Sequence, residues 1–187
     1  MVVFIKEFMN KGEVFMNSIL ETILTRRSIR SFSDKQISKE DLQTIVQAGI
    51  YAPSGKNQQS WKFTVIQKPE VIEKLAAAVK QALQAEHYDF YCPNALILLS
   101  NDRNNSNGLA DCACALENIF LMAKELEIGS CWINQLKDTS DNPEVRTLLT
   151  DFKIPSSHIV WGVAALGYAK EQPQPKPRKE GTVHYIL

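Results

Sequence analysis

The apolar run at residues 95–100 (ALILLS) is the feature that most constrains the fold of this chain. A strand without alternating polar and apolar residues offers neither face to water, so it lies inside a sheet that is covered on both sides. Two long segments have the apolar spacing of covering helices: residues 70–86, entered through Pro69, and residues 109–127, which we expect Gly129 to cap. The sequence therefore predicts a layered α+β domain around a central strand.

The remaining periodic segments are short, and several have recognisable caps or breakers. The sequence Ser38-Lys39-Glu40-Asp41 is a capping box, and Pro53 stops the helix that it begins. We expect helices at residues 17–25, 38–51 and 142–150, with Asn17 or Ser18 as the first cap and Pro143 in the first turn of the last helix. We expect strands at residues 62–67, 130–134 and 158–166.

Composition limits the classes of partner. The chain has 187 residues, enough for one domain with a real core, and its 21 basic residues balance 21 acidic ones. A formally neutral chain has no overall field that attracts nucleic acid or an anionic membrane. No apolar run approaches the roughly 20 residues that a bilayer span needs. We therefore expect no nucleic-acid partner and no membrane partner.

Neither the cysteines nor the histidines have the spacing of a metal site or a catalytic triad. The cysteines lack the C-x2-4-C pairing of a zinc site and are typical of small buried thiols in a reducing, cytoplasmic compartment. The histidines show no metal or triad spacing, so we expect no bound metal and no catalytic side chain from the protein itself. These residues are Cys92, Cys112, Cys114, Cys131, His87, His158 and His184.

The two ends of the chain differ from its body. Residues 1–15 lack the plan of a signal peptide, and the codons for residues 11–13 (KGE) can form a purine-rich ribosome-binding site just before Met16. Two interpretations stay open: an extension from a misassigned start, with Met16 as the natural beginning, or a genuine N-terminal arm. We expect residues 16–187 to form one domain, with residues 170–187 as an extended, Pro-rich arm. The β-like residues 182–187 could pair with another subunit's sheet edge or return to their own sheet.

Two segments contain groups suited to ligand binding. Arg26, Arg27, Ser28 and Arg30 place three guanidinium groups and a hydroxyl within five residues, and alternate members share one face if the backbone is extended. Guanidinium groups bind phosphate oxygens through charge-assisted, partly bidentate hydrogen bonds. Alone, this segment is more often a solvated basic loop. Residues 52–61 (APSGKNQQSW) add turn residues and side-chain amides, which hydrogen-bond a planar heterocycle.

Together these segments resemble the FMN-dependent nitroreductase family, whose members typically show R-R-S-x-R-x-F and, after the next helix, A-P-S-[SG]-x-N-x-Q-P-W. The chain has RRSIRSF at residues 26–32, and the similarity continues through LEIGSCW, LGYA and PKPR, which begin at Leu126, Leu166 and Pro175. Ser60 replaces the usual proline, and the segment between Glu86 and Pro93 is too short for the helical lid of larger members. The resemblance implies an α+β nitroreductase-like fold, with a central mixed sheet flanked by helices and a C-terminal arm exchanged in a homodimer.

The same resemblance implies the cofactor FMN and a role for each matching position. The basic residues and Ser28 would bind the phosphate, joined by Lys176 or Arg178 from the tail. The second segment would contact the isoalloxazine ring or ribityl chain from the partner subunit, and residues 134–136 would approach the flavin nitrogen N5. The implied cofactor-binding residues are Arg26, Arg27, Ser28, Arg30, Pro53, Ser54, Gly55, Asn57, Gln59, Asn134, Gln135, Lys176 and Arg178.

The function implied in this way is that of an NAD(P)H-dependent FMN oxidoreductase. NADH or NADPH would reduce the flavin by hydride transfer to N5, and a small electron-poor acceptor, such as a nitroaromatic or a quinone, would then take two electrons in a ping-pong mechanism. A flavin-binding carrier, a sensor or a flavin-consuming relative would use the same contacts and stays open. A basic-loop interaction module without flavin is disfavoured by the neutral charge and the second segment.

Overall fold

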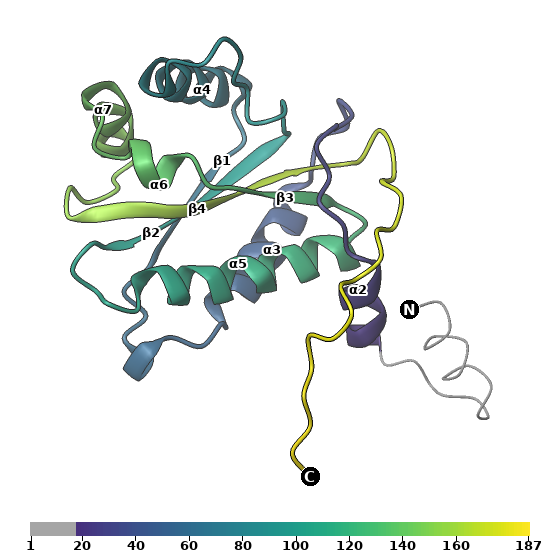
Figure 1. Ribbon diagram of the computed structural model, residues 1–187. Coiled ribbons are helices and arrows are strands. Elements are labelled where there is room, and N and C mark those ends of the chain that lie inside the picture. The colour runs from purple at the N-terminus through teal and green to yellow at the C-terminus, as the bar shows by residue number, and fades with distance from the viewer. Residues whose placement is uncertain (1–17) are drawn as a thin grey trace.

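The computed structural model describes residues 18–187 and has one four-stranded sheet at its centre (Figure 1). The order across the sheet is β1-β2-β4-β3, and each neighbouring pair is antiparallel. The strands are β1 (Lys62–Ile66), β2 (Ala95–Asp102), β3 (Gly129–Ile133) and β4 (His158–Gly167). The α+β class is confirmed, but the expected mixed sheet is antiparallel throughout, and its one parallel contact among residues 18–187 is the isolated bridge between Ser28 and Ser130.

Helices cover both faces of this sheet, which gives three layers (Figure 1). Helices α3 and α5 lie on one face, and α4, α6 and α7 lie on the other. The helices are α2 (Ser18–Thr25), α3 (Lys39–Ile50), the single turn η1 (Gly55–Asn57), α4 (Pro69–Leu83), α5 (Gly108–Glu125), α6 (Leu136–Thr139) and α7 (Pro143–Asp151).

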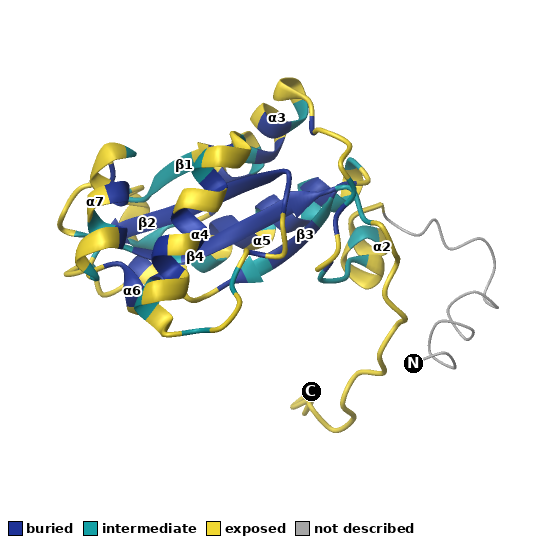
Figure 2. Ribbon diagram, turned by 90° about the horizontal axis from the view of Figure 1, so that it is seen from above, coloured by how far each residue is buried: buried dark blue, intermediate teal, exposed yellow. Residues whose placement is uncertain are grey.

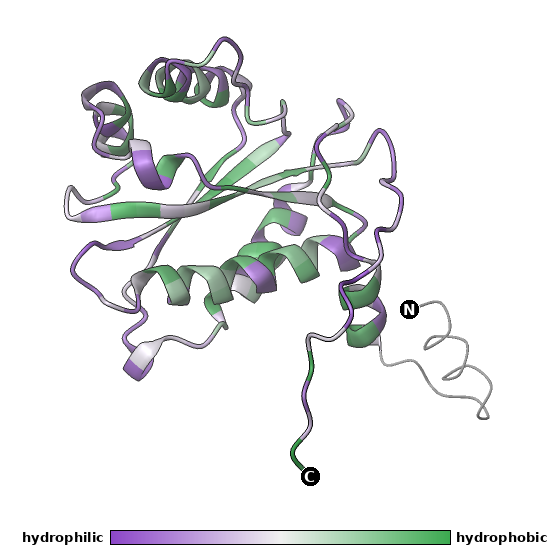
Figure 3. Ribbon diagram, viewed as in Figure 1, coloured by the Kyte–Doolittle hydropathy of each residue, from purple (hydrophilic) through white to green (hydrophobic). Residues whose placement is uncertain are grey.

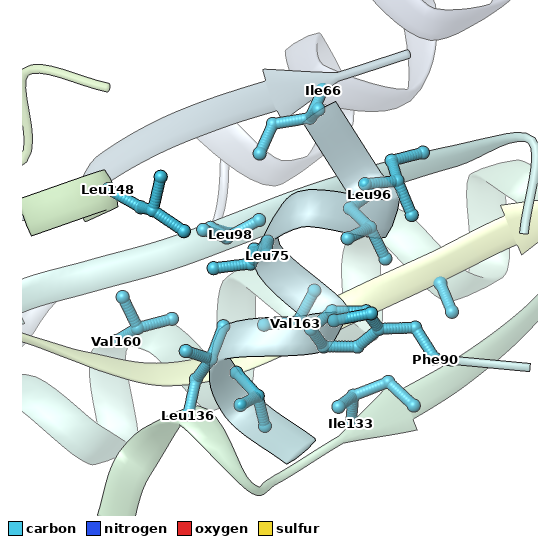
Figure 4. Close-up of a cluster of buried hydrophobic side chains, with 14 of the residues drawn as sticks. Ile66, Leu75, Phe90, Leu96, Leu98, Ile133, Leu136, Leu148, Val160 and Val163 are labelled. Carbon is cyan, nitrogen blue, oxygen red and sulfur yellow. The ribbon is translucent and has the colours of Figure 1, made fainter. Parts of the chain in front are cut away.

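Strand β2 is central and doubly covered, as its apolar run predicts. Leu96 and Leu98 belong to the core cluster under α4, α6 and α7, which Figure 4 shows in close-up. Ile97 and Leu99 point the opposite way, into the cluster against α3 and α5. All four are fully buried, and Figure 2 shows the sheet as the dark interior of the molecule. Because both faces of β2 are dry, neither can be polar without losing the burial that stabilises the fold.

The predicted cap at Ser38 is confirmed, and a second cap, which was not predicted, begins α7. The Ser38 hydroxyl oxygen accepts the backbone N–H of Asp41 at 2.9 Å, which begins α3. The Asn142 side-chain oxygen accepts the N–H of Glu144 at 3.1 Å, ahead of Pro143 in the first turn of α7. Each bond satisfies one of the backbone donors that a helix start leaves without a partner.

The end of α5 is a correction. The helix is capped at Leu126 and turns through Glu127, whose φ is 59°, so Gly129 does not cap it but begins β3. A glycine is needed at position 129 for a different reason: a Cβ there would lie 2.7 Å from Cγ1 of Ile29. Leu109, expected on the apolar face of α5, is 46% exposed.

Two further expectations are wrong in part, and one helix was not expected. Helix α4 ends at Leu83, before residue 86, because Gln84 takes a left-handed conformation with φ 53°. The short helix α6 was not expected at all. Cys112 and Cys131 are buried, as expected, whereas Cys92 and Cys114 are exposed; all four are free thiols.

The arm at residues 170–187 is exposed throughout and contains no strand. The alternative that residues 182–187 return to their own sheet is therefore wrong, and pairing with another subunit stays a prediction. The expectations about residues 1–15, the start at Met16 and a cap at Asn17 lie outside the described residues. Among residues 18–187, none of the helices combines the length and the apolar character that crossing a membrane requires.

Candidate functional site

The basic segment, residues 26–30, lies against the outer edge of β3. The Ile29 N–H donates to the Ser130 carbonyl at 2.9 Å, and Ser28 forms the parallel bridge with the same residue. The Ile29 side chain is 5% exposed and packs in the core, where Gly129 leaves room for it. The segment is thus fixed by its backbone and by one apolar anchor, while its polar side chains on either side stay at least partly accessible.

The chain after this segment is fixed to the start of the C-terminal arm. Phe32, also 5% exposed, forms an antiparallel bridge with Ala169. The Ser33 N–H donates to the Tyr168 carbonyl at 2.7 Å, and the Lys170 N–H donates to the Ser31 carbonyl at 3.0 Å. The arm therefore leaves the body of the molecule beside the basic segment.

The three guanidinium groups have different neighbours. Arg26 lies 3.8 Å from the Glu117 carboxylate. Arg30 lies over the Tyr91 ring, with Cζ 5.8 Å from the ring centre. Arg27 donates to the carbonyl oxygens of Leu24 and Arg26 at 2.8 and 2.7 Å, so it is partly committed to the end of α2.

The positive charges of two of these arginines affect the pKa of the buried Cys131 thiol, on β3. Burial raises the pKa of this thiol, and the nearby positive charges of Arg30 and Arg26 lower it in part. Both guanidinium groups therefore act on the same part of β3. The net pKa of Cys131 is still raised, which disfavours the reactive thiolate form.

A cavity of about 110 Å³ opens between this segment, the end of α5 and β3. Arg26, Arg27 and Lys124 supply three cations to its wall, and Glu127 is the one acid there. Lys124 was not among the predicted site residues; its position in the last turn of α5, near the negative end of the helix dipole, suggested only a structural role. A concave site with this excess of positive charge can bind a phosphate group.

The amide loop, residues 54–59, has an unusual backbone. Lys56, Asn57 and Gln59 all have φ between 48° and 55°, in the left-handed region that costs non-glycine residues roughly 1 kcal/mol or more each. The Ser54 hydroxyl oxygen accepts the Gln59 N–H at 3.1 Å, and the Gln59 side-chain amide donates to the Asn57 side-chain oxygen at 2.8 Å. Pro53, just before the loop, is exposed. The loop presents exposed amide groups in one defined conformation.

Asp111, in the first turn of α5, forms a hydrogen bond with this loop. Its carboxylate accepts the Gly55 N–H at 2.8 Å, and the residue is 4% exposed. Sequence reasoning missed it, because an acid in a first turn is ordinary helix chemistry and the partner lies 56 residues earlier in the chain.

The amide loop and the cationic cavity contact different parts of α5. The amide loop contacts α5 at Asp111, whereas the cationic cavity contacts it at Lys124, about 20 Å further along at 1.5 Å per residue. Figure 1 shows α2 beside one end of α5 and the blue turn η1 beyond the other.

The remaining predicted residues lie at the far end of β3 and on the arm. Asn134 and Gln135 follow β3 and are exposed, and Gln135 lines a cavity of about 210 Å³ with Tyr88 and Ile133. Lys176 and Arg178 lie on the exposed arm, whereas the residue of the arm that lines the cationic cavity is Gln172. Strand β3 therefore links the basic segment at Ser130 to the exposed amides that follow its last residue.

Comparison with known proteins identifies the family of the chain. Residues 23–168 match the model of the Nitroreductase family. A protein of Archaeoglobus fulgidus with the provisional name NADH dehydrogenase/NAD(P)H nitroreductase is 36% identical over 164 residues, which cover 84% of this chain and 88% of the relative. The FMN reductase (NADPH) of Bacillus subtilis is 25% identical over 188 residues, covering 90% of this chain and 74% of that protein.

Among solved structures, a nitroreductase of Bacteroides fragilis with bound FMN superimposes with a TM-score of 0.84. It is 39% identical to this chain, and the match covers 91% of this chain and all of that one. The family match spans the basic segment, the amide loop and all four strands. The chain belongs to the nitroreductase family.

Proposed function

We propose that this protein is an FMN-dependent oxidoreductase that takes electrons from NADH or NADPH and reduces small electron-poor molecules, such as nitroaromatics or quinones. The observation that carries the proposal is the cationic cavity on the edge of β3, formed by Arg26, Arg27 and Lys124. Two findings from the relatives support it: one solved relative contains FMN, and others are named for NAD(P)H-dependent reduction.

The residues present fit FMN in chemical type at each part of the molecule. Arg26 and Arg27, which line the cavity with Lys124, would bind the phosphate. Ser28 and Arg30 belong to the same segment but do not line the cavity, and they would add to this binding. Lys176 or Arg178 of the arm would add to it. The exposed amides of Asn57 and Gln59, with Ser54, Gly55 and Pro53, would contact the ring or ribityl chain, and Asn134 and Gln135 would lie near its reactive edge.

Bound FMN supplies the hydride and electron chemistry of the reaction, so the protein itself needs no nucleophile or acid–base pair. The tasks of its own residues are to neutralise the phosphate, to orient the ring and to restrict access to it.

A second copy of the chain would complete the site. The amide loop contacts α5 at Asp111 and the cationic cavity contacts it at Lys124, about 20 Å further along the helix, with Arg26 beside Glu117 between them. One flavin would combine the basic segment of one subunit with the amide loop of the other. Leu20, Ile23 and Leu24 of α2 are each more than one-third exposed, which is unusual for three neighbouring apolar residues of one helix. Figure 3 shows α2 and the end of the arm in green, as apolar segments at the surface. We therefore propose a homodimer with exchanged arms.

The alternative of a flavin carrier or sensor uses the same contacts and differs in turnover. Names of relatives that include reductase activity favour turnover. The experiment is the visible spectrum of the purified protein before and after anaerobic addition of NADH or NADPH. The proposal predicts a two-banded flavin spectrum that bleaches and returns when a nitroaromatic is added. Bound flavin that stays oxidised would favour the carrier, and failure to bind added FMN would refute the proposal.

A further inference from the structure

We propose that Asp111 is a positioning residue for flavin binding: its buried carboxylate sets the conformation of the amide loop that contacts the flavin ring. This inference rests on the proposed function. It assigns a role in ring binding to a residue that belongs to neither of the two predicted binding segments.

The hydrogen bond between Gly55 and Asp111 is short and shielded from water. The Asp111 carboxylate accepts the Gly55 N–H at 2.8 Å and is 4% exposed. A hydrogen bond to a charged acceptor shielded from water is among the stronger ones in proteins. Gly55 also approaches the start of α5 closely, because a Cβ at position 55 would lie 2.4 Å from the side-chain nitrogen of Asn107. Gly55 therefore fits closely between two residues at the start of α5.

The other end of the loop is tied to the same cluster. Asn105 donates its side-chain N–H to the Ser60 hydroxyl at 3.0 Å and approaches the second Asp111 oxygen at 3.5 Å. The Ser60 hydroxyl donates to the buried Asn101 oxygen at 3.0 Å. Asp111 thus belongs to a polar cluster that fixes both ends of the loop, at Gly55 and at Ser60.

The residues between these two ends are the strained ones. Lys56, Asn57 and Gln59 have left-handed backbones, which relax unless the surroundings enforce them. The loop has no buried apolar side chain between Ser54 and Gln59 to enforce this conformation. The bond to Asp111 is the one contact between this stretch and a buried charge on α5. The bonds from Gln59 to Ser54 and Asn57 lie within the loop, so without Asp111 the loop and its amides are no longer positioned against α5.

The test compares FMN with riboflavin, which lacks the phosphate, as ligands of four proteins. Asp111→Leu removes the acceptor, and Asp111→Asn keeps an acceptor oxygen without the charge. Asp102→Asn is the matched control, because the Asp102 carboxylate accepts the Asn104 N–H at 2.8 Å and stabilises a neighbouring turn. The fourth protein is the wild type. Affinities come from fluorescence titration, and visible circular dichroism of each saturated complex reports the ring environment.

We expect Asp111→Leu to weaken both flavins by the same factor, roughly tenfold, and to change the dichroism of the bound ring. Asp111→Asn should recover most of the affinity, and Asp102→Asn should match the wild type in both readouts. Wild-type affinities in Asp111→Leu, or a loss confined to FMN, would overturn the inference while leaving the proposed function intact. A wild-type protein that binds neither flavin would overturn both.

A second measurement keeps the inference testable if Asp111→Leu does not fold. Hydrogen exchange of the Gly55 amide is measured by NMR in the flavin-bound wild-type protein. A donor bonded to a buried carboxylate should exchange at least a hundredfold more slowly than an unprotected loop amide. Exchange at the rate of an unprotected amide would show that the bond to Asp111 does not restrain the loop.

Discussion

The basic segment and the amide loop are two parts of one proposed site, yet they are held in opposite ways. The basic segment pairs with the edge of β3 through its backbone, and its residue Ile29 is buried. Phe32, two residues beyond the end of the segment, is buried as well, so this part of the chain belongs to the core. The amide loop buries no apolar side chain between Ser54 and Gln59 and depends on a hydrogen bond from Gly55 to Asp111.

Because of this difference, mutations in the two regions should have different effects on the free energy of unfolding and on flavin binding. Damage to the anchors of the basic segment should lower the free energy of unfolding and phosphate binding together. Damage to the amide loop should lower ring binding and leave the free energy of unfolding nearly unchanged. The predictions below use this contrast, from the largest effect to the smallest.

Ile29→Ala should have the largest effect. It removes buried methyl groups where the segment docks against β3, at a cost of about 2–5 kcal/mol in the free energy of unfolding. Urea unfolding measures the loss, with Leu83→Ala at the exposed end of α4 as the control. A loss below about 0.5 kcal/mol would mean that the segment is not part of the core.

Arg26→Ala should remove a charge-assisted phosphate contact and leave stability almost unchanged. We expect FMN affinity to fall by about 1.5–3 kcal/mol, roughly ten- to a hundredfold, and riboflavin affinity to stay the same. Fluorescence titration with both ligands checks this. Arg103→Ala is the control, since Arg103 pairs with Asp141, which lines neither proposed part of the site. Equal losses of affinity for FMN and riboflavin would show that Arg26 does not contact the phosphate.

Gly55→Ala should show the converse pattern. The added Cβ would displace the Asn107 side chain or the loop, so both flavins should bind about 1 kcal/mol more weakly, near the lower end of overpacking costs. The midpoint of urea unfolding should change little. An unfolding midpoint that falls as far as that of Ile29→Ala would erase the contrast between the two regions.

Asp141→Asn should have the smallest effect and should change neither flavin affinity. Hydrogen bonds from Arg103 and Arg146 hold the pKa of Asp141 below its ordinary value. A carboxyl with a lowered folded-state pKa contributes stability above its unfolded-state pKa of about 4, and this contribution disappears as the pH falls through the folded-state pKa. The pair is exposed, so we expect a loss of less than about 1 kcal/mol at pH 7.

Urea unfolding of Asp141→Asn and wild type at pH 7 and at pH 3 checks the sign of this effect. The difference should shrink at the lower pH, because the stabilising contribution of ionised Asp141 decreases as the pH falls toward its lowered folded-state pKa. A difference that grows as the pH falls would contradict the assigned direction.

Local chemistry predicted much of this fold. The cap at Ser38, Pro143 in the first turn of α7 and the apolar run of β2 each act within a few residues, and each prediction is confirmed. The end of α5 was not predictable in this way. Gly129 is a glycine because Ile29, a hundred residues earlier, packs against it, and not because it caps a helix.

The same distinction applies to the candidate site. Arg26 and Asn57 lie in motifs whose chemistry is visible in the sequence, so they could be named from it. Asp111 and Lys124 could not, because their positions in the first and last turns of α5 are also explained by the helix dipole. Their relation to the two segments depends on tertiary contacts across the chain.

The most direct test of the central claim uses mixed dimers. One subunit has Arg26→Ala with Arg30→Ala, and the other, with a different affinity tag, has Asn57→Ala with Gln59→Ala. If each site combines the basic segment of one subunit with the amide loop of the other, a mixed dimer contains one intact site and one doubly damaged site. The account predicts one FMN bound per mixed dimer with wild-type affinity. If no FMN binds to the mixed dimers with wild-type affinity, each site takes both segments from the same chain. That result would contradict the account.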